Sequence, residues 1–414
     1  MVLTPVLNGE ASVNPSSSSN CIYCGDNFTV LQYLLEEHKN LIDMIYIDPP
    51  YNTGKDFTFR DSFKHDRYRS LLPSLQDTKN VDPHSLWRLF MEPRLEISRD
   101  LLSERGLIFI SIDDNEIHNL RQMMGEIYGE ANFIATLVRQ SGVAPRQDAR
   151  HVAVQHDYVV IYAKDSKKTI LNRKPSALKG FVHEDEHVEE RGRYRLNKLD
   201  RGSIRYSESL DYPIRTTDGI EVWPGGDPDD KKWTWRWSEK KVVWGVENDF
   251  IVFKKSRNGK ASVYFKEYEK VDNQCRQMVR TNPYSTLIRG CPNEKGSREL
   301  KALFKRRVFD YPKPVVLIKR LLKMGSHKDS LILDFFAGAG STGQAVWELN
   351  RQDSGTRQFI LAQLDEPVLD EEVAKDFPTV ADITIERMRR VAKQYSESDN
   401  SDNLFGFGVF RMPS

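Results

Sequence analysis

A strand that runs directly into two prolines constrains this chain more than any other feature. Residues 42–47 (IDMIYI) are apolar at all but one position, which predicts a buried strand, and Asp48, Pro49, Pro50 and Tyr51 follow at once. Because two prolines fix φ and remove backbone donors, the chain can continue neither as a strand nor as a helix. The sequence therefore predicts a stiff acidic loop at the carboxyl end of a strand, where open α/β sheets bind ligands.

Such a loop suits the handling of an aromatic amine. The Asp48 carboxylate and the Pro49 carbonyl can both accept hydrogen bonds from an exocyclic amino group, and the Tyr51 ring can stack on the base that carries it. Short motifs also match by accident, and an ordinary proline-rich turn capped by an aspartate would have the same residues. The tetrapeptide alone leaves both interpretations open.

A second strand and turn lies far downstream. Residues 331–334 (LILD) form another apolar strand, and a glycine-rich turn (residues 335–343, FFAGAGSTG) follows before a helix predicted over 344–349. Gly338 and Gly340 let the backbone approach a ligand at the amino end of that helix. The glycine spacing also matches the G-x-G-x-x-G fingerprint of dinucleotide-binding oxidoreductases, so this motif alone leaves that class open.

Together and in this order, the two motifs resemble those of the β-class adenine-N6 DNA methyltransferases. The chain is most similar to the modification (Mod) subunits of type III restriction-modification systems, from about residue 20 to residue 411. The resemblance rests on residues 48–56 (DPPYNTGKD), 106–114 (GLIFISIDD), 309–314 (FDYPKP), 334–340 (DFFAGAG) and 406–410 (GFGVF). Ala339 departs from the more usual serine, and the chain is shorter than typical Mod subunits.

The resemblance implies a Rossmann-like methyltransferase fold, with a mostly parallel sheet and an inserted β-rich target-recognition region. It implies methyl transfer from S-adenosylmethionine to the N6 amino group of an adenine flipped out of double-stranded DNA. The catalytic residues would be Asp48, Pro49, Pro50 and Tyr51. The cofactor-binding residues would be Asp26, Lys313, Asp334, Phe336, Gly338, Gly340, Thr342 and Gln363. Gln363 stands where many relatives carry a ribose-binding acid, and Asp365 and Glu366 follow it.

Two other functions remain open. Cytosine-N4 methyltransferases share the scaffold but usually carry serine in place of the first aspartate, so Asp48 favours adenine. A DNA-binding specificity subunit could keep the fold without turnover, although it would have no need of an intact Asp48 loop. A nicotinamide oxidoreductase would explain neither this loop nor the basic middle of the chain.

The middle of the chain differs from its ends in charge and periodicity. The whole chain has a net charge of +1, but residues 165–310 contain 32 Lys and Arg against 23 Asp and Glu, or +9. Short alternating strands replace the earlier alternation of strands and helices. Trp233, Trp235 and Trp237 alternate with polar residues on one predicted strand face, and indoles are usually core residues. The residues predicted to contact DNA are Lys254, Lys255, Arg257 and Arg236.

These patterns predict five segments. They are a disordered tail (1–19), a first catalytic part (20–164), the target-recognition insert (165–308), a second catalytic part (309–395), and a linker with a closing strand (396–414). No apolar run is long enough to cross a bilayer and no signal peptide is evident, so a cytoplasmic protein is expected. Cys21 and Cys24 form a C-x-x-C, but no second Cys pair or His pair stands at zinc-ligand spacing, so no metal is expected. The expected partners are double-stranded DNA, a second copy in a homodimer and, by resemblance, a restriction subunit.

Overall fold

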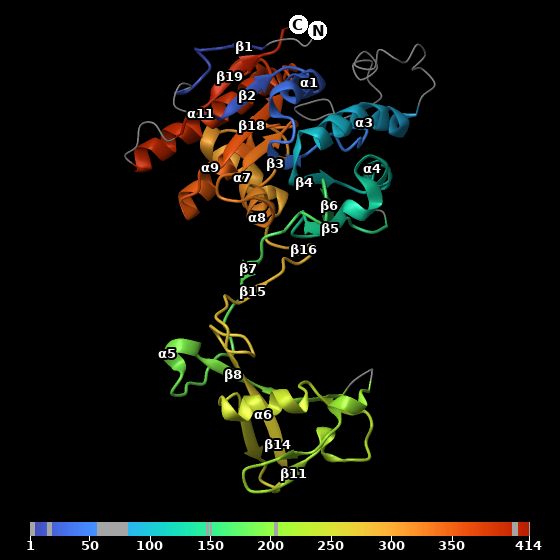
Figure 1. Ribbon diagram of the computed structural model, residues 1–414. Helices are drawn as coiled ribbons and strands as arrows, with labels where there is room; N and C mark the ends of the chain where they lie inside the picture. Colours follow the sequence, from blue (N-terminus) through green and yellow to red (C-terminus); the bar gives the residue numbers. More distant parts are fainter. Residues whose placement is uncertain are drawn as a thin grey trace. The chain divides into compact units, whose positions relative to one another are not determined.

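The structure, a computed structural model, describes residues 5–14, 19–55, 82–145, 149, 151–202, 206–399 and 405–413. The chain divides into two compact units (Figure 1). The large unit comprises residues 1–172 and 284–414, and the small unit comprises residues 173–283. Among the described residues, no helix is long and apolar enough to cross a membrane.

The described part of the large unit contains a 10-stranded sheet. The strands across it are β1 (Val6–Leu7), β19 (Gly408–Arg411), β2 (Cys21–Cys24), β18 (Gln358–Gln363), β17 (Leu331–Asp334), β3 (Ile42–Ile47), β4 (Leu102–Ile112), β6 (His156–Ala163), β5 (Phe133–Gln140) and β16 (Leu287–Ile288). The run from β19 to β4 is parallel. Strand β6 lies antiparallel between β4 and β5, β16 pairs parallel with β5, and β1 pairs antiparallel with β19.

The central strands are apolar because helices cover both of their faces. Met44 and Tyr46 of β3 point to one hydrophobic core, and Ile45 and Ile47 point to the other. A strand buried on both faces has no solvent-facing position for polar residues, so its sequence is a nearly continuous apolar run. The strand predicted over residues 42–47 is confirmed with those bounds.

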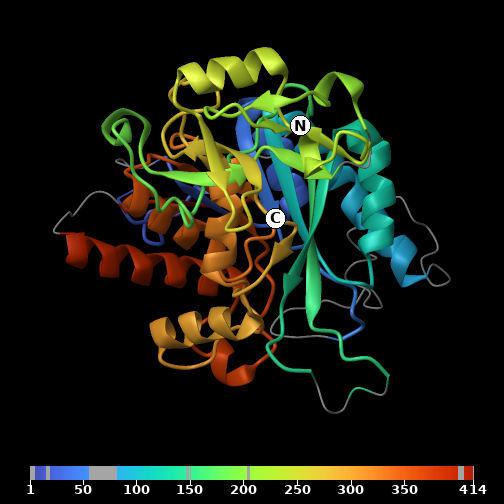
Figure 2. The ribbon, with the colours of Figure 1, turned by 90° about the horizontal axis from the view of Figure 1, so that it is seen from below.

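Different helices cover the two faces of the sheet (Figure 2). On one face lie α1 (Asn27–His38), α3 (Pro83–Leu101) and α4 (Ile117–Met124), and on the other lie α8 (Val315–Gly325), α9 (Ser341–Asp353) and α11 (Val380–Asp399). A third, smaller cluster contains side chains of α7 (Asn293–Phe304) and α10 (Glu371–Ala374). Short turns η2 (Gly125–Gly129) and η3 (Glu130–Asn132) join α4 to β5.

The start of the chain differs from its prediction. Residues 5–14 were expected in a disordered tail, but Val6 and Leu7 pair with Arg411 and Phe410, and Val13 forms a bridge with Phe407. The physical reason is that β19 would otherwise present a row of unpaired backbone groups at the sheet edge. The closing strand at the end of the chain thus holds the beginning of the chain in place.

The small unit has its own core. Its strands are β7 (Lys174–Pro175), β8 (Tyr194–Lys198), β9 (Asp200–Gly202), β10 (Ile214–Arg215), β11 (Glu221–Val222), β12 (Trp233–Trp235), β13 (Ile251–Lys255), β14 (Ala261–Tyr268) and β15 (Thr281–Asn282). Helices α5 (Val188–Arg191) and α6 (Glu239–Glu247) and the turns η4 (Glu208–Leu210) and η5 (Pro224–Gly226) complete it. Trp235 and Trp237 are buried in its core, which confirms their interpretation as packing residues, while Trp233 is half-buried.

The small unit is narrower than the insert expected at residues 165–308. Residues 165–172 and 284–308 belong to the large unit, where β16 joins the main sheet and α7 packs beside it. The small unit contains 23 Lys and Arg against 19 Asp and Glu, a net charge of +4. Part of the basic excess of the middle segment therefore lies in the large unit.

Candidate active site

The carboxyl ends of the parallel strands meet at one edge of the large sheet. Asp48 follows β3, Asp334 ends β17 and Gln363 ends β18, and because the three strands are parallel neighbours these ends lie at the same edge. A cavity of about 360 Å³ opens at this edge, and all three residues line it. The two motifs, separated by nearly the whole chain, thus contribute to one cavity, at the place where open α/β sheets bind ligands.

The Asp48 carboxylate is held by two neighbouring side chains. Its Oδ1 atom accepts a 2.8 Å hydrogen bond from the Tyr51 hydroxyl and lies 2.7 Å from the Lys313 Nζ. Lys313 also donates to the Tyr51 oxygen at 2.8 Å. Burial raises the pKa of Tyr51 well above its ordinary value, so the hydroxyl remains a donor. Lys313, which the resemblance assigns to the cofactor, therefore directly contacts the Asp-Pro-Pro-Tyr loop.

The loop itself is fastened to the helices behind it. The Trp87 indole donates to the Pro50 carbonyl at 2.7 Å. Asn52 adopts a left-handed φ of 56°, which asparagine tolerates, and its side chain donates to Glu116 Oε1 at 2.6 Å. Glu116 is fully buried and also contacts His84 Nδ1 at 2.7 Å. The loop is therefore positioned before any ligand arrives.

The glycine turn forms a second wall of the cavity. Gly338 and Gly340 have φ values of 53° and 76°, which glycine adopts without strain, and helix α9 begins directly after them. The Gly338 N–H donates to Gln363 Oε1 at 2.7 Å, and the Thr384 hydroxyl donates to the Gly338 carbonyl at 2.5 Å. Arg387, fully buried, donates to the Ala339 carbonyl at 3.1 Å. The turn is thus fixed from two sides.

Gln363 has a structural contact that its sequence position did not indicate. Its side-chain oxygen accepts the hydrogen bond from the Gly338 N–H, and its Nε2 lies 3.4 Å from the Leu364 carbonyl. Of the two acids that follow, Asp365 pairs with Arg411 at 2.7 Å, whereas Glu366 lines the cavity. Ribose binding by Gln363 stays a prediction, and Glu366 is a second candidate for it.

Asp334 lies at the floor of the cavity and is almost fully buried. Its Oδ2 atom accepts from the Thr342 hydroxyl at 2.5 Å and its Oδ1 atom from the Phe336 N–H at 3.1 Å. Burial raises the pKa of Asp334 to about 7, and these two hydrogen bonds only partly oppose that effect. The side chain is therefore poised to gain or lose a proton near neutral pH.

Asp26 stands at another side of the same cavity. It caps helix α1 by accepting from Phe28 N at 3.0 Å, and it pairs with the buried Arg94 at 3.0 Å. Arg94 also donates to Asn27 at 2.6 Å, whose amide reaches the Phe335 carbonyl at 2.8 Å. This chain of contacts ties the start of α1 to the end of β17. Seven of the eight predicted cofactor-binding residues line the cavity, and Gly340 is not among the lining residues. The seven are Asp26, Lys313, Asp334, Phe336, Gly338, Thr342 and Gln363.

The residues predicted to contact DNA lie in the small unit. Lys254 and Lys255 are exposed at the end of β13, and Arg257 and Arg236 are exposed in loops. Lys255 forms an ion pair with Asp218, and the Lys254 ammonium lies 5.5 Å from the centre of the Tyr264 ring. All four are on the surface, and their role in DNA binding stays a prediction.

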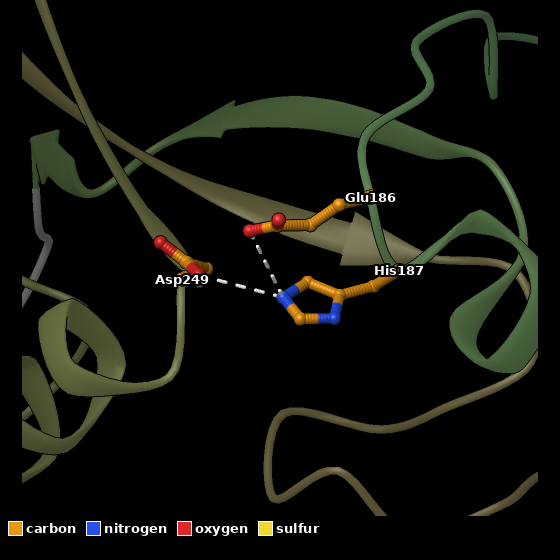
Figure 3. Close-up of side chains that lie close together, drawn as sticks. All are labelled: Glu186, His187 and Asp249. Carbon is orange, nitrogen blue, oxygen red and sulfur yellow. Dashed lines mark hydrogen bonds and ion pairs between the residues drawn. The ribbon is translucent and has the colours of Figure 1, made fainter.

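The small unit also brings together Glu186, His187 and Asp249 (Figure 3). The His187 Nε2 atom lies 3.4 Å from Asp249 Oδ2 and 3.9 Å from Glu186 Oε1. Both carboxylates are more than half exposed, with side-chain exposures of 58% and 79%. Ion pairing of a histidine with two solvated carboxylates accounts for this arrangement.

A mostly parallel sheet between two helix layers, with a glycine turn and an Asp-Pro-Pro-Tyr loop at its carboxyl edge, defines a Rossmann-like methyltransferase fold. The predicted fold class is confirmed. The chain belongs to the DNA methylase family, whose model matches residues 42–376.

Named relatives agree with this family. The chain is 32% identical to the type III restriction-modification enzyme StyLTI Mod subunit of Salmonella typhimurium, over 99% of this chain and 63% of that protein. It is 31% identical to the type II methyltransferase M.KpnI of Klebsiella pneumoniae, over 92% of this chain and 89% of that protein. A solved structure of the PvuII cytosine-N4-specific DNA methyltransferase aligns over 91% of this chain and 94% of its own, with 12% identity and a TM-score of 0.41. The chain spans 63% to 65% of the type III Mod subunits that it matches at 30% identity or more.

Proposed function

We propose that this chain transfers a methyl group from S-adenosylmethionine to the N6 amino group of an adenine in double-stranded DNA. One observation carries the proposal: Asp48 of the acidic loop lines the same cavity as the glycine turn, so an amino group and a cofactor can meet there. The relatives named as a Mod subunit and a type II methyltransferase support the same activity.

The contacts of Asp48 suit it to orient an amino group. The N6 lone pair of adenine is delocalised into the ring, so it must be drawn out of conjugation before it can attack a methyl carbon. Tyr51 and Lys313 both contact Oδ1, and no side chain of the described residues donates a hydrogen bond to Oδ2. Oδ2 is thus available to accept a hydrogen bond from N6. Positioning and preorganised charge supply the acceleration, and no covalent intermediate with the enzyme is needed.

The cavity fits S-adenosylmethionine. Gly338 brings the backbone to the cavity, and Gly340 lets the turn lead directly into helix α9. Phe336 offers an apolar wall, and Asp334 offers a carboxylate to a positively charged group. When bound, the cofactor supplies a methyl group on a sulfonium. Asp26, Thr342, Lys313 and Gln363 complete the set of residues that would surround it, as the resemblance implies.

Asp48 also bears on the alternatives. A cytosine-N4 methyltransferase is the second candidate, and the aspartate at this position favours adenine. A specificity subunit without turnover would have no use for a loop fastened by Trp87, Asn52 and Glu116. Such preorganisation is what a reacting group requires.

The partners follow from this activity. We propose that the small unit reads the DNA sequence, that the protein acts as a homodimer in the cytoplasm, and that a restriction subunit is a further partner. The Mod subunits among its relatives support the last point. Light scattering of the protein alone and with DNA would test the dimer.

Transfer of labelled methyl groups tests the proposed activity. Genomic DNA free of N6-methyladenine is incubated with labelled S-adenosylmethionine and either the wild-type protein or Asp48→Ala. We expect label in DNA with the wild type and none with the variant. DNA binding by the wild type without any label would instead support the specificity subunit.

A further inference from the structure

A second polar wall faces the cavity from the antiparallel side of the sheet. Asp157 near the start of β6, Ser141 after the end of β5, and Asn293 at the start of α7 line the same cavity as Asp48. The Asn293 N–H donates to the Ser141 carbonyl at 3.0 Å, which joins the start of α7 to the end of β5. None of these residues belongs to the motifs recognised in the sequence.

Arg139 organises this wall from behind. It is fully buried, and its Nε donates to Asp157 Oδ1 at 2.6 Å while its Nη2 donates to Asp157 Oδ2. The same Nη2 donates to Asn293 Oδ1 at 2.8 Å, and Nη1 donates to the Cys291 carbonyl at 2.9 Å. Burial disfavours the charge of Arg139, but Asp157 more than offsets this and raises the arginine pKa. The guanidinium is therefore a permanent donor.

This arrangement fixes which way the Asn293 amide faces. The oxygen and nitrogen of an asparagine amide are assigned from their hydrogen-bond partners, and a guanidinium can only donate. Oδ1 must therefore face Arg139, because the opposite orientation would set two donors against each other. The Nδ2 hydrogens have no hydrogen-bond partner among the described residues, and Asn293 lines the cavity. Asn293 thus presents a donor where Asp48 presents an acceptor.

An acceptor and a donor that line one cavity can match the edge of adenine. Its N6 amino group donates, and the ring nitrogens N1 and N7 on either side accept. Resting on the proposed function, we propose that Asn293 donates to one of these ring nitrogens while Asp48 accepts from N6. Guanine and thymine carry a carbonyl in place of the amino group and would oppose Asp48. Cytosine presents the same donor and acceptor pair, so Asn293 does not separate adenine from cytosine.

Analogues that lack one ring nitrogen test this directly. A duplex with the site methylated by the wild type carries adenine, 1-deazaadenine or 7-deazaadenine at the target, and single-turnover methyl transfer is measured. For the wild type, we expect one analogue to react roughly tenfold more slowly, the effect of one lost hydrogen bond. For Asn293→Ala, we expect the rate of methyl transfer to adenine to fall by a similar factor. In this variant, the sensitive analogue should react as fast as adenine.

Two further variants complete the experiment. Asn293→Asp keeps the oxygen that faces Arg139 but replaces the donor by an acceptor, so we expect it to be slower than Asn293→Ala. Gln122→Ala removes an exposed amide on α4 outside the cavity and should keep the wild-type rate and the full analogue effect. An analogue effect that persists unchanged in Asn293→Ala, or its absence from the wild type, would overturn the role of Asn293. Failure of the wild type to methylate adenine at all would instead overturn the proposed function.

Discussion

At the scale of single residues, Asp48 is the group on which the proposed chemistry depends. Asp48→Ala removes the acceptor for N6 and leaves the cofactor side of the cavity intact, since the glycine turn is held by Gln363 and Thr384. We expect methyl transfer to fall by about 1000-fold, the upper end of the effect of losing one preorganised polar group at a reacting centre. Calorimetry should show nearly unchanged affinity for S-adenosylmethionine. Continued formation of N6-methyladenine by the variant would refute the mechanism.

Asp334 predicts a pH dependence of cofactor binding. Because burial raises its pKa to about 7, the empty site holds mostly the neutral acid below that pH. The positively charged cofactor favours the carboxylate, so its affinity should rise as the pH increases through about 7 and then level off. Binding near pH 6.5 should release a proton, which calorimetry in buffers of different ionisation enthalpy detects.

The matched variant for this prediction is Asp334→Asn. It keeps the size of the side chain and an oxygen for Thr342 but cannot ionise. Its affinity should be weaker and independent of pH over the same range. If the wild type has a flat pH profile, Asp334 does not bind the charged part of the cofactor.

Single residues could be predicted where one short stretch of sequence determines them. Asp48 and Gly338 follow directly from local motifs, and both line the cavity. Asn293 and Arg387 could not be found in this way, because their partners lie 154 and 48 residues away. Glu116 could have been found from the sequence, because it is one of several acidic residues that follow a buried strand, at the edge where ligands bind.

At the scale of structural elements, the glycine turn before α9 should be essential for cofactor binding. Gly338→Val places a β-branched residue at a φ of 53°, which strains the backbone by about 1–2 kcal/mol. A β-carbon there would meet Phe309 at an ordinary 3.6 Å, so the protein should still fold. We expect the strained turn and added methyl groups to abolish measurable cofactor affinity by calorimetry.

Gly219→Val is the control for strain alone. Gly219 has a φ of 82° with open space around its β-carbon position, and it lines no part of the cavity. This variant should lose stability but keep cofactor affinity. Wild-type affinity in Gly338→Val, or binding of NADH in its place, would show that the turn has another role.

The exposed end of β13 predicts how binding depends on salt. Lys254 and Arg257 are solvent-exposed cations, whereas Lys255 already pairs with Asp218. Changing Lys254 and Arg257 to alanine should weaken binding to all sequences alike and reduce the slope of log K against log salt by about two. Lys39→Ala with Lys375→Ala removes the same charge from the large unit and should leave the slope unchanged. Equal slopes for the two double variants would exclude these phosphate contacts.

At the scale of the whole molecule, the division into units predicts that sequence choice and chemistry separate. Replacing residues 173–283 with the equivalent segment of a relative exchanges the small unit and leaves every residue that lines the cavity in place. We expect the methylated sequence to change while the modified base stays the same. Methylation mapping of genomic DNA from cells expressing each protein would show this. An unchanged target sequence would place the reader in the large unit.

The boundaries of the predicted segments depend on contacts that a single stretch of sequence does not show. Alternating strands and helices revealed the layered sheet, because both faces of its central strands are buried. The predicted insert was broader than the small unit because two of its elements belong to the large unit. Strand β16 has only two residues and is defined by its pairing with β5. Helix α7 has a largely polar sequence and is placed by its packing against α10. The first strand was missed for the same reason, since two residues have no pattern of their own.

The central claim is that this site methylates adenine at N6, and mass spectrometry of nucleosides tests it most directly. DNA free of methylated bases is incubated with the wild-type protein and S-adenosylmethionine that carries a deuterated methyl group, then hydrolysed to nucleosides. We predict deuterated N6-methyl-2′-deoxyadenosine as the only labelled product and none with Asp48→Ala. Deuterated N4-methyl-2′-deoxycytidine, or no labelled nucleoside from the wild type, would contradict the claim.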